Sequence, residues 1–333
     1  MNALTVRTAL CLGALTLTMQ AGAAELVLPR DGWTSWQVDA VAGAPDWCCW
    51  SKGDDRDTSR ASCRLDQDSD NFGARDHKTT DSVRVYARLA SGKVERLRVL
   101  SAGCAVETTT PIHELGSVST DDSSRWMSAL AKRNDAIKGD DLRDNVFAAL
   151  AMHRGEVAQN TLTEIARGIG PMETRKKAVF WLALVRGTTG AEVVRSVMLG
   201  DPDRQMRQHA AFAMSQSGSP GAAADLTLLG NTDKDGEVRA QAWFWLAQTD
   251  SPGAEAAILA ALRKDQDNHV REQAVFALSQ LPDERATRAL VAVAEDQTLS
   301  REQRKRAVFW LAQSETAGAQ TYLEKVLLGN AAR

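Results

Sequence analysis

The sequence has no excess of charge of one sign, because its 40 Lys and Arg residues nearly balance its 43 Asp and Glu residues. Nucleic-acid-binding surfaces need clustered basic side chains, so this balance argues against a nucleic-acid partner. The sequence also lacks a Walker loop, a G-x-S-x-G elbow and an H-E-x-x-H motif, which excludes the enzyme classes that depend on them. With 44% hydrophobic and 25% charged residues, the composition is that of a globular protein.

Long hydrophobic runs are absent after the first two dozen residues. The start of the chain carries Arg7, then an apolar run over residues 9–19, then Ala-Gly-Ala at residues 21–23. This order is typical of a secretory signal peptide with a small-residue cleavage site. A transmembrane anchor is the weaker interpretation, because a spanning helix needs about 20 apolar residues. We therefore predict a signal peptide over residues 1–24, a mature chain without a transmembrane segment, and a periplasmic or secreted location.

Cysteine is absent from residue 105 to the end, and the mature chain has only Cys48, Cys49, Cys63 and Cys104. In an oxidising compartment, four cysteines predict two disulfides. A bond between adjacent Cys48 and Cys49 would be strained. Two pairings remain: Cys48–Cys63 with Cys49–Cys104, or Cys48–Cys104 with Cys49–Cys63. The alternative is a four-thiolate zinc site, which the compartment and the absence of a C-x₂₋₄-C spacing disfavour.

Residues 25–110 predict a small β-rich head domain, because short runs alternate there with many turn residues. Residues 83–89 alternate apolar and polar side chains, Ser91-Gly92 supplies a tight turn, and residues 94–100 form the returning strand. Large side chains and disulfides can fill the thin core of so small a domain. The alternative is an aromatic binding platform. Both interpretations concern the four tryptophans that lie near Cys48 and Cys49 in the sequence, namely Trp33, Trp36, Trp47 and Trp50.

An acidic stretch at residues 66–71 opens like a calcium-binding loop, with Asp at alternate positions. Its sixth position is Asn71, where the turn needs Gly, and its twelfth is His77, where a bidentate Glu is required. We interpret the stretch as a solvated acidic loop, with calcium binding as the alternative. We predict no metal ion and no cofactor.

The rest of the chain repeats with a period of 32 residues, lengthened once to 33. Each unit contains a first helix, a turn that often holds Pro or Gly, and a second helix. Two stacked helices per unit define an α-solenoid. We predict a connecting helix within residues 111–140 and an array of about six helix pairs over residues 141–333. The period is carried by an Arg column (Arg143, Arg175, Arg207, Arg239, Arg271, Arg304) and a Phe column (Phe180, Phe212, Phe244, Phe276, Phe309).

The repeat unit has the pattern D-x-x-V-R-x-x-A-x-x-A-L-x-x-L at residues 267–281, and it recurs with small departures at residues 235–248 and 203–216. It resembles the short HEAT-like repeat that is also found in phycobilin lyases, over residues 141–329. The order of signal peptide, Trp- and Cys-rich head and AVFWLAQ repeats is similar to exported bacterial HEAT-repeat proteins of unassigned activity. The resemblance implies a mainly α fold, and it identifies the fold more specifically than the function.

Asp and Arg stand one helical turn apart at the start of three units. The Asp can cap free N–H groups, and the Arg can reach an Asp of a neighbouring unit. Arg175 and Arg304 begin units that lack this Asp, so we expect the contacts to weaken there. We interpret the column as a structural ladder, built from Arg175, Arg207, Arg239, Arg271 and Arg304 with Asp203, Asp235 and Asp267.

The position after the Phe column alternates between Ala and Trp, which places Trp181, Trp245 and Trp310 in every second unit. One interpretation is a core in which large and small residues let adjacent layers interdigitate. The other is a stripe of Trp side chains along one face, spaced to anchor a peptide or an extended partner. The three Trp residues are therefore the candidate binding residues.

Enzymatic activity has little support in the sequence. The di-iron hydroxylases of this fold carry several paired His-Glu motifs, whereas only His113-Glu114 occurs here, outside the array. A bilin lyase would need a reactive group such as Cys, and the array has no Cys. We predict a non-enzymatic scaffold or adaptor that binds another protein along the solenoid. The alternative is a hydrolase or lyase that uses His113, Glu114 and Asp46 in a cleft between head and array.

Overall fold

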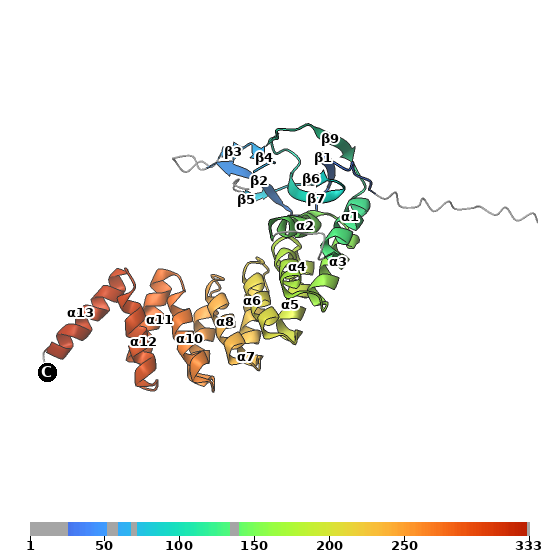
Figure 1. Ribbon diagram of the computed structural model, residues 1–333. Coiled ribbons are helices and arrows are strands. Elements are labelled where there is room, and N and C mark those ends of the chain that lie inside the picture. Colours follow the sequence, from blue (N-terminus) through green and yellow to red (C-terminus); the bar gives the residue numbers. More distant parts are fainter. Residues whose placement is uncertain (1–25, 52–58, 68–71, 134–139, 332–333) are drawn as a thin grey trace, which may run out of the picture.

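The computed structural model describes residues 26–51, 59–67, 72–133 and 140–331. A β-rich head with two disulfides comes first, and an α-solenoid follows, as the sequence predicts. The head lies over the N-terminal end of the solenoid, and the helix pairs lead away from it towards the C-terminus (Figure 1). The fold is therefore mainly α, with its sheets confined to one end.

The four-stranded sheet of the head has the strand order β7-β6-β1-β9, and smaller sheets have the orders β3-β2-β5 and β4-β8. β6 and β7 form the predicted hairpin, with Ser91 and Gly92 both at positive φ in the turn. β9 pairs in parallel with β1, so the sheet extends to Ser117, past the predicted boundary at residue 110. The described strands are β1 (Gly32–Asp39), β2 (Pro45–Ser51), β3 (Ser59–Ala61), β4 (Cys63–Arg64), β5 (Phe72–Thr79), β6 (Ser82–Ala90), β7 (Lys93–Ser101), β8 (Val106–Glu107) and β9 (Ile112–Ser117).

The four-stranded sheet buries both of its faces, because successive side chains of a strand point to opposite sides. On one face, Trp36 and Val85 pack into the main core, which continues into the helices of the solenoid. On the other face, Trp33 and Tyr86 pack with the four cysteines in a second, smaller core. The head is thus joined to the solenoid through a shared core, while its outer part has a core of its own.

The two disulfides lie in the second core and have the second of the two predicted pairings. Cys48 is bonded to Cys104 and Cys49 to Cys63, with Cα–Cα distances of 5.8 and 5.3 Å. Neighbouring residues of a strand face opposite sides, so adjacent Cys48 and Cys49 reach different partners. Among the described residues, Asp46, Cys48 and Cys104 lie close enough together to hold a metal ion. Because both cysteines are in disulfides, this group offers no thiolate.

Asp66, the first residue of the acidic stretch, is bound within the head. Its carboxylate accepts hydrogen bonds from Trp33 Nε1 at 3.0 Å, from Thr108 Oγ1 at 2.9 Å and from the Thr109 backbone N–H at 2.8 Å. Burial alone would raise the pKa of Asp66, but these hydrogen bonds outweigh burial and hold the pKa well below its usual range. This end of the stretch is therefore not the solvated loop that we expected, and residues 68–71 lie outside the described residues.

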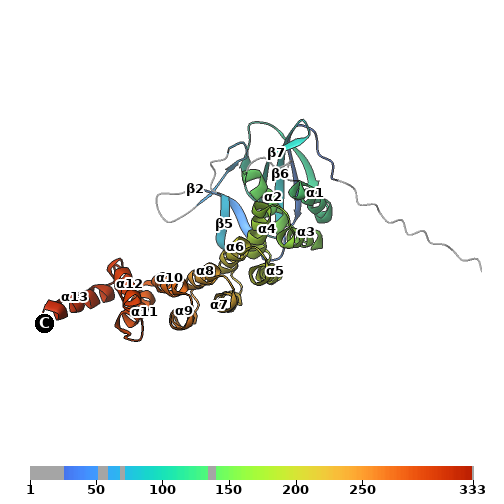
Figure 2. The ribbon, with the colours of Figure 1, turned by 60° about the horizontal axis from the view of Figure 1, so that its bottom comes forward.

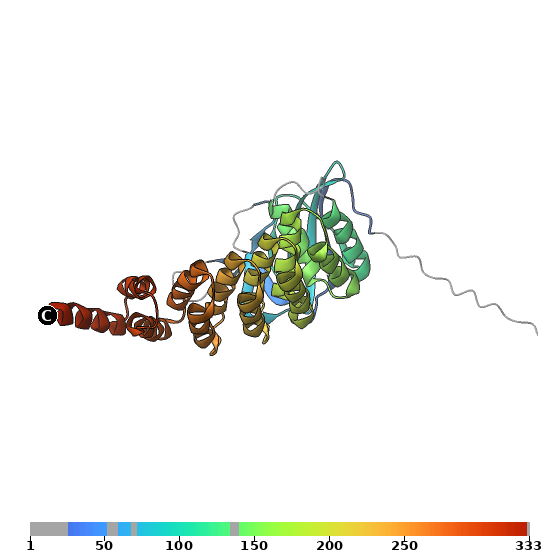
Figure 3. The ribbon, with the colours of Figure 1, turned by 90° about the horizontal axis from the view of Figure 1, so that it is seen from below.

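The described helices α2 to α13 form six pairs, in which the even-numbered helix comes first. Even-numbered and odd-numbered helices form two layers (Figure 2), and the pairs stack in one row (Figure 3). No helix in the described ranges is long and apolar enough to cross a membrane. The helices are α1 (Thr120–Lys132), α2 (Asp140–Met152), α3 (Glu156–Arg167), α4 (Met172–Val185), α5 (Gly187–Gly200), α6 (Arg204–Ser215), α7 (Ala222–Thr232), α8 (Gly236–Ala247), α9 (Ala254–Lys264), α10 (Asn268–Ser279), α11 (Asp283–Glu295), α12 (Arg301–Ala312) and α13 (Ala317–Ala331).

Small residues let the helices of the solenoid approach closely. Gly230 on α7 lies against the indole of Trp243 on α8, where an added Cβ would stand only 2.6 Å from the ring. Ala at the centre of the even-numbered helices from α4 to α12 has the same effect between units. These residues are fully buried, as Ala178, Ala210, Ala242, Ala274 and Ala307 show.

Candidate functional site

The three candidate tryptophans lie on α4, α8 and α12, in the layer of even-numbered helices. Trp181 is only 4% exposed, and its Nε1 donates to Asp144 at 3.0 Å. Trp245 and Trp310 are half-buried. The Ala residues that alternate with the three tryptophans are fully buried, namely Ala149, Ala213 and Ala277. Trp181 therefore contributes mainly to the core, whereas Trp245 and Trp310 also reach the surface.

The aromatic side chains of this layer form a continuous series of ring contacts, which we call the aromatic row. It begins in the head with Trp47 on β2, whose ring centroid lies 5.6 Å from that of Trp181. From α4 to α12, each ring centroid then lies 4.8 to 6.0 Å from the next. The aromatic row consists of Trp47, Phe180, Trp181, Phe212, Phe244, Trp245, Phe276, Phe309 and Trp310.

Two kinds of contact alternate along the aromatic row and explain the double period of Trp. Phe180 stacks on Phe212 with an interplanar angle of 11° and a centroid distance of 6.0 Å. Phe212 then meets Trp245 of the next unit at 4.9 Å and 52°. The same two contacts recur one double period later between Phe244, Phe276 and Trp310. The Phe column thus supplies five of the nine rings of the aromatic row. The sequence analysis did not include these Phe residues in the candidate surface, although their 32-residue spacing was visible.

The aromatic row is partly open to solvent along its length. Phe180, Phe212, Phe244 and Phe276 are half-buried, and Phe309 at the C-terminal end is 54% exposed. Packing between units therefore covers only part of each Phe side chain. What remains is a narrow apolar strip on the layer of even-numbered helices.

Charged side chains one helical turn from the aromatic row are paired with each other. Lys177 Nζ lies 3.0 Å from Asp144 Oδ1, and this pair joins α4 to α2. Arg306 lies 3.1 Å from Glu272, and this pair joins α12 to α10. Because these charges neutralise one another, they create no strong field of one sign beside the strip.

The predicted ladder has a different partner from the one the sequence suggested. Asp233 and Arg207 are each only 4% exposed, and their closest side-chain atoms are 2.6 Å apart. Asp233 lies two residues before Asp235, the capping residue that the sequence singled out. Within the described residues, three such buried or half-buried pairs occur, Arg175–Asp201, Arg207–Asp233 and Arg239–Asp265.

Each of these Asp partners also fixes the start of the next even-numbered helix. Asp233 Oδ1 accepts a 2.9 Å hydrogen bond from the backbone N–H of Asp235. Asp235 in turn caps α8 by accepting from the N–H of Glu237 at 2.9 Å. The hydrogen bond with Asp233 raises the pKa of Arg207. The same arrangement recurs at the caps Asp203 and Asp267.

The last two Arg residues of the column bind differently. Arg271 donates to the backbone carbonyl of Asp265 at 2.7 Å and to the side chain of Asn268. Arg304 donates to the backbone carbonyl of Leu299. The expected weakening at Arg175 is wrong, because its partner is Asp201 and not a capping Asp.

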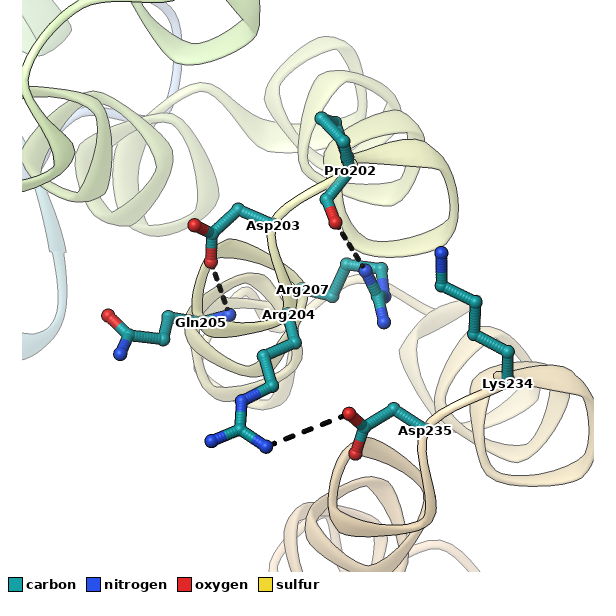
Figure 4. Close-up of a pocket in the computed structure, with 7 residues that line it drawn as sticks. All are labelled: Pro202, Asp203, Arg204, Gln205, Arg207, Lys234 and Asp235. Atoms are coloured by element: carbon teal, nitrogen blue, oxygen red, sulfur yellow. Dashed lines mark hydrogen bonds and ion pairs between the residues drawn. The ribbon is translucent and has the colours of Figure 1, made fainter.

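An open polar hollow of about 450 Å³ lies beside the ladder, between the starts of α6 and α8 (Figure 4). Arg204 points across it towards Asp235 at 3.8 Å, and Arg207 donates to the Pro202 carbonyl at 3.2 Å. Both arginines and Asp235 are thus engaged with groups that line the hollow, and we assign the hollow to the ladder. It is lined by Pro202, Asp203, Arg204, Gln205, Arg207, Lys234 and Asp235.

A buried hydrogen-bond network joins the head to the first helices. Trp36 Nε1 donates to Ser123 Oγ at 2.7 Å, and Ser123 Oγ lies 2.7 Å from His153 Nε2. His153 Nδ1 lies 2.5 Å from the Ala149 carbonyl, so Nδ1 carries the proton and Ser123 donates to Nε2. Burial lowers the pKa of His153 to about 4. Although a Ser–His contact is the arrangement of many hydrolases, Ser123 and His153 are fully buried, out of reach of a substrate.

The residues of the alternative catalytic site lie in different sheets. His113 and Glu114 are exposed on β9, an edge strand of the four-stranded sheet. Glu114 lies 3.4 Å from Arg84. Asp46 is on β2 in the three-stranded sheet, and it is only 5% exposed.

The paired helices, the repeated caps and the ring contacts at a fixed period define a solenoid of short helical repeats. Residues 160–242 and 228–312 match the family model of HEAT repeats. The helix pairs over residues 160–312 are therefore HEAT repeats.

Two solved structures show a weaker similarity. One is human deoxyhypusine hydroxylase in complex with glycerol, at 13% identity, covering 62% of this chain and 89% of that chain, with a TM-score of 0.29. The other is the complex of CpcE and CpcF of phycocyanin lyase from Nostoc sp. PCC7120, at 15% identity, covering 61% and 80%, also with a TM-score of 0.29. TM-scores this low support no argument about activity. No curated protein matches the sequence.

Proposed function

We propose that this chain is a non-enzymatic scaffold or adaptor of the periplasm, and that it binds an extended segment of another protein along the aromatic row. The observation that carries the proposal is the unbroken series of ring contacts from Trp47 in the head to Phe309 on α12, in which every ring except the buried Trp181 is at least partly exposed. Aromatic side chains dominate the binding energy of many protein interfaces. A solenoid presents them at regular spacing over a long surface.

The spacing of the aromatic row favours a particular kind of partner segment. Rings of neighbouring units that are in contact have centroids 4.9 to 6.0 Å apart. A β-strand rises about 3.3 Å per residue, and its successive side chains point to opposite sides. It therefore presents the same side about every 6.6 Å, which is close to the spacing of these rings. An extended segment with an apolar side chain at every second position suits this row.

The location is supported by the signal-peptide pattern at residues 1–24 and by the two disulfides. Structural disulfides persist in oxidising compartments such as the bacterial periplasm. The mass of the chain purified from a periplasmic extract tests this part of the proposal. We expect the mass of a chain that has lost the signal peptide and contains two disulfides, and a full-length reduced chain would contradict it.

Site-specific photo-crosslinking in cells tests the binding surface. A photo-reactive phenylalanine analogue replaces Phe276 in the aromatic row, and in a second variant it replaces Leu228. Leu228 lies on α7, in the other layer, and it is 38% exposed. We expect a discrete crosslinked protein from position 276 and none from position 228.

A second substitution in the crosslinking chain then tests whether the rings anchor the partner. Trp245→Ala should weaken the crosslink from position 276 about tenfold or more, since a hot-spot residue contributes at least about 2 kcal/mol. Leu228→Ala is the matched control and should leave the crosslink unchanged. Equal crosslinks from both layers, or none from the aromatic row, would disprove the proposed surface.

A further inference from the structure

Four of the even-numbered helices end with a glutamine, one helical turn after the Phe of the aromatic row. The stretches are FAMSQ at residues 212–216, FWLAQ at 244–248, FALSQ at 276–280 and FWLAQ at 309–313. Residues four apart lie on the same face of a helix, so each glutamine lies beside the ring of its unit. We call these C-cap residues of α6, α8, α10 and α12 the glutamine row, which consists of Gln216, Gln248, Gln280 and Gln313.

The glutamine row alternates between bonded and open side-chain amides. In α6 and α10, Gln216 and Gln280 donate through Nε2 to Oγ of the preceding Ser, both at 3.1 Å. In α8 and α12 an Ala replaces that Ser, and within the described residues neither the Gln248 nor the Gln313 side chain has a hydrogen-bond partner. Both of these glutamines are exposed. The open amides therefore occur in units that carry Trp as well as Phe in the aromatic row.

Uncharged side chains also border the aromatic row on its other side. Gln241 on α8 and Gln273 on α10 lie one helical turn before the Phe of their unit, and both are half-buried. At the same position of α6, burial lowers the pKa of His209, so this side chain is neutral at pH 7. The residues at this position of α4 and α12 are charged, and each is paired with an acidic side chain. The middle of the aromatic row thus lies between neutral polar groups, which favour an uncharged occupant.

A neutral amide can bind the backbone of an extended chain. It has two N–H donors and a carbonyl acceptor, which match the C=O and N–H groups at an edge of a β-strand. Along a strand, the backbone groups at one edge recur at every second residue, and so do the side chains on one face. A segment whose apolar side chains lie on the rings therefore turns its backbone groups towards the glutamines at the same period.

The unit next to the head departs from this pattern. Its stretch is FWLAL at residues 180–184, and Leu184, which stands in place of Gln, is 37% exposed. This unit offers a segment apolar contact but no amide at that position. Contacts with the backbone of a segment therefore belong to the units from α6 to α12.

We propose that the glutamine row binds the backbone of the extended segment, with the open amides of Gln248 and Gln313 as its principal contacts. Their N–H groups donate to carbonyl oxygens of the segment, and their carbonyl oxygens accept from its N–H groups. The segments that bind share an extended conformation with apolar side chains at alternate positions, and they do not share one sequence. This inference rests on the proposed function, because it assigns further residues to the same surface.

Binding of a synthetic peptide that alternates Leu and Ser to the purified, oxidised chain tests the proposal, with fluorescence anisotropy as the measurement. Gln248→Leu introduces the side chain that α4 carries at this position, so it removes the amide and adds apolar surface. We expect Gln248→Leu and Gln313→Leu each to weaken binding about fivefold, the effect of about one lost hydrogen bond. Gln320→Leu on α13, at an exposed Gln outside the glutamine row, is the matched control and should leave binding unchanged. Circular dichroism confirms that each variant keeps its helices.

An analogue of the peptide with an ester backbone gives a second measurement, because it keeps the side chains but lacks the N–H groups. We expect the natural chain to bind this analogue at least about tenfold more weakly than the peptide, since several hydrogen bonds are lost at once. Gln248→Leu should weaken binding of the analogue less than binding of the peptide, because the two changes remove the same hydrogen bonds. Equal affinity for the peptide and the analogue would refute recognition of the backbone.

Trp245→Ala separates this inference from the proposed function. If Trp245→Ala weakens peptide binding and neither Gln248→Leu nor Gln313→Leu does, the rings bind the segment without the glutamine row, and only this inference is wrong. If the peptide does not bind at up to about 1 mM, or a neutral oligosaccharide such as a chitin fragment binds in its place, recognition of a peptide backbone is refuted. The crosslink from position 276 in cells then still decides the proposed function.

Discussion

The head and the solenoid are stabilised by contacts of different range along the chain. In the head, β1 pairs with β6 and β9, and the Cys48–Cys104 disulfide joins residues 56 positions apart. In the solenoid, the Arg207–Asp233 pair spans 26 residues, and its counterparts in neighbouring units span the same distance. The head therefore has contacts that are not repeated, several of them between distant parts of the chain. The solenoid instead repeats one contact of medium range from unit to unit.

This difference predicts that the two regions lose stability in different ways when a contact is removed. When a cross-link between distant residues is lost, folding of the head must bear the full entropic cost of closing the long loop between them. When one contact is lost in the solenoid, the neighbouring units keep theirs, because the stability of a repeat array is a sum of unit and nearest-neighbour terms. A substitution that breaks a long-range contact in the head should therefore unfold a whole part of the head. A substitution that breaks one contact in the solenoid should destabilise only the neighbouring units.

The largest loss of stability is expected when the Cys48–Cys104 disulfide of the head is removed. Replacing Cys48 and Cys104 by Ser removes a cross-link over 56 residues, which corresponds to about 4 kcal/mol of unfolding free energy in the loop-entropy relation. The second core around Trp33 and Tyr86 should unfold at lower denaturant concentration, while the helices of the solenoid remain. The near-ultraviolet circular dichroism signal comes from the aromatic side chains of both regions, so an early partial loss of this signal marks the unfolding of the head. The far-ultraviolet signal follows the helices of the solenoid.

The other disulfide supplies the matched control for this experiment. Cys49 and Cys63 are separated by 14 residues, so replacing both by Ser should cost less, about 3 kcal/mol. Loss of both circular dichroism signals at the same denaturant concentration would show that head and solenoid unfold as one unit, against the comparison drawn above.

A buried ladder pair should have the next largest effect. Asp233→Asn keeps the size of the side chain but leaves the Arg207 charge buried without its partner. Breaking a buried ion pair in this way costs about 3 kcal/mol or more. We expect a broader thermal transition of the helical signal, because the boundary between α7 and α8 opens first, with no change in the head.

An exposed ion pair between two odd-numbered helices is the control. Asp225 on α7 binds Arg195 at 2.7 Å, but the Arg195 side chain is 48% exposed. Asp225→Asn should therefore cost less than about 1 kcal/mol. If both variants lose the same stability, burial is not what makes the ladder strong.

The solenoid was largely predictable from the sequence because its contacts repeat. A period of 32 residues revealed the helix pairs, the Arg column and the capping role of Asp235. The true partner, Asp233, recurs at the same period with Asp201 and Asp265. It was overlooked because the i,i+4 spacing drew attention to the capping Asp, while the ion pair spans the length of a whole helix pair.

The head was predictable only where its contacts are local. The hairpin of β6 and β7 was found because its alternation and its turn lie within twenty residues. The parallel pairing of β9 with β1 was not, because nothing in either strand identifies a partner about 80 residues away. The choice between two disulfide pairings depends on the faces of β2, which a one-dimensional pattern does not contain.

The aromatic row likewise was predictable where its residues repeat along the sequence, and it was not predictable where distant segments meet. The spacing of Trp181, Trp245 and Trp310 was visible in the sequence as an alternation with Ala. The contact of Trp181 with Trp47 was not visible, since Trp47 reaches the aromatic row only through the docking of the head on the helices.

The smallest effect concerns the junction, where His153 belongs to both regions through Ser123 and Trp36. Burial lowers the pKa of His153 to about 4, against 6.5 for the unburied side chain. Between these values the unfolded chain binds the proton and the folded chain does not. Stability from this group is therefore complete above pH 6.5 and falls with falling pH, by about 2 kcal/mol at pH 5.

Denaturation at a series of pH values, for the natural chain and for His153→Gln, measures this loss. The Gln side chain does not titrate, so the variant should lose less stability than the natural chain between pH 6.5 and pH 5, whatever its stability at neutral pH. The difference between the two curves isolates His153 from the carboxylates and from His209, which titrate in both proteins. Parallel curves would mean that His153 is protonated without opening the junction, and that other contacts, such as the shared apolar core and the Arg154–Asp39 pair, fasten the head to the solenoid.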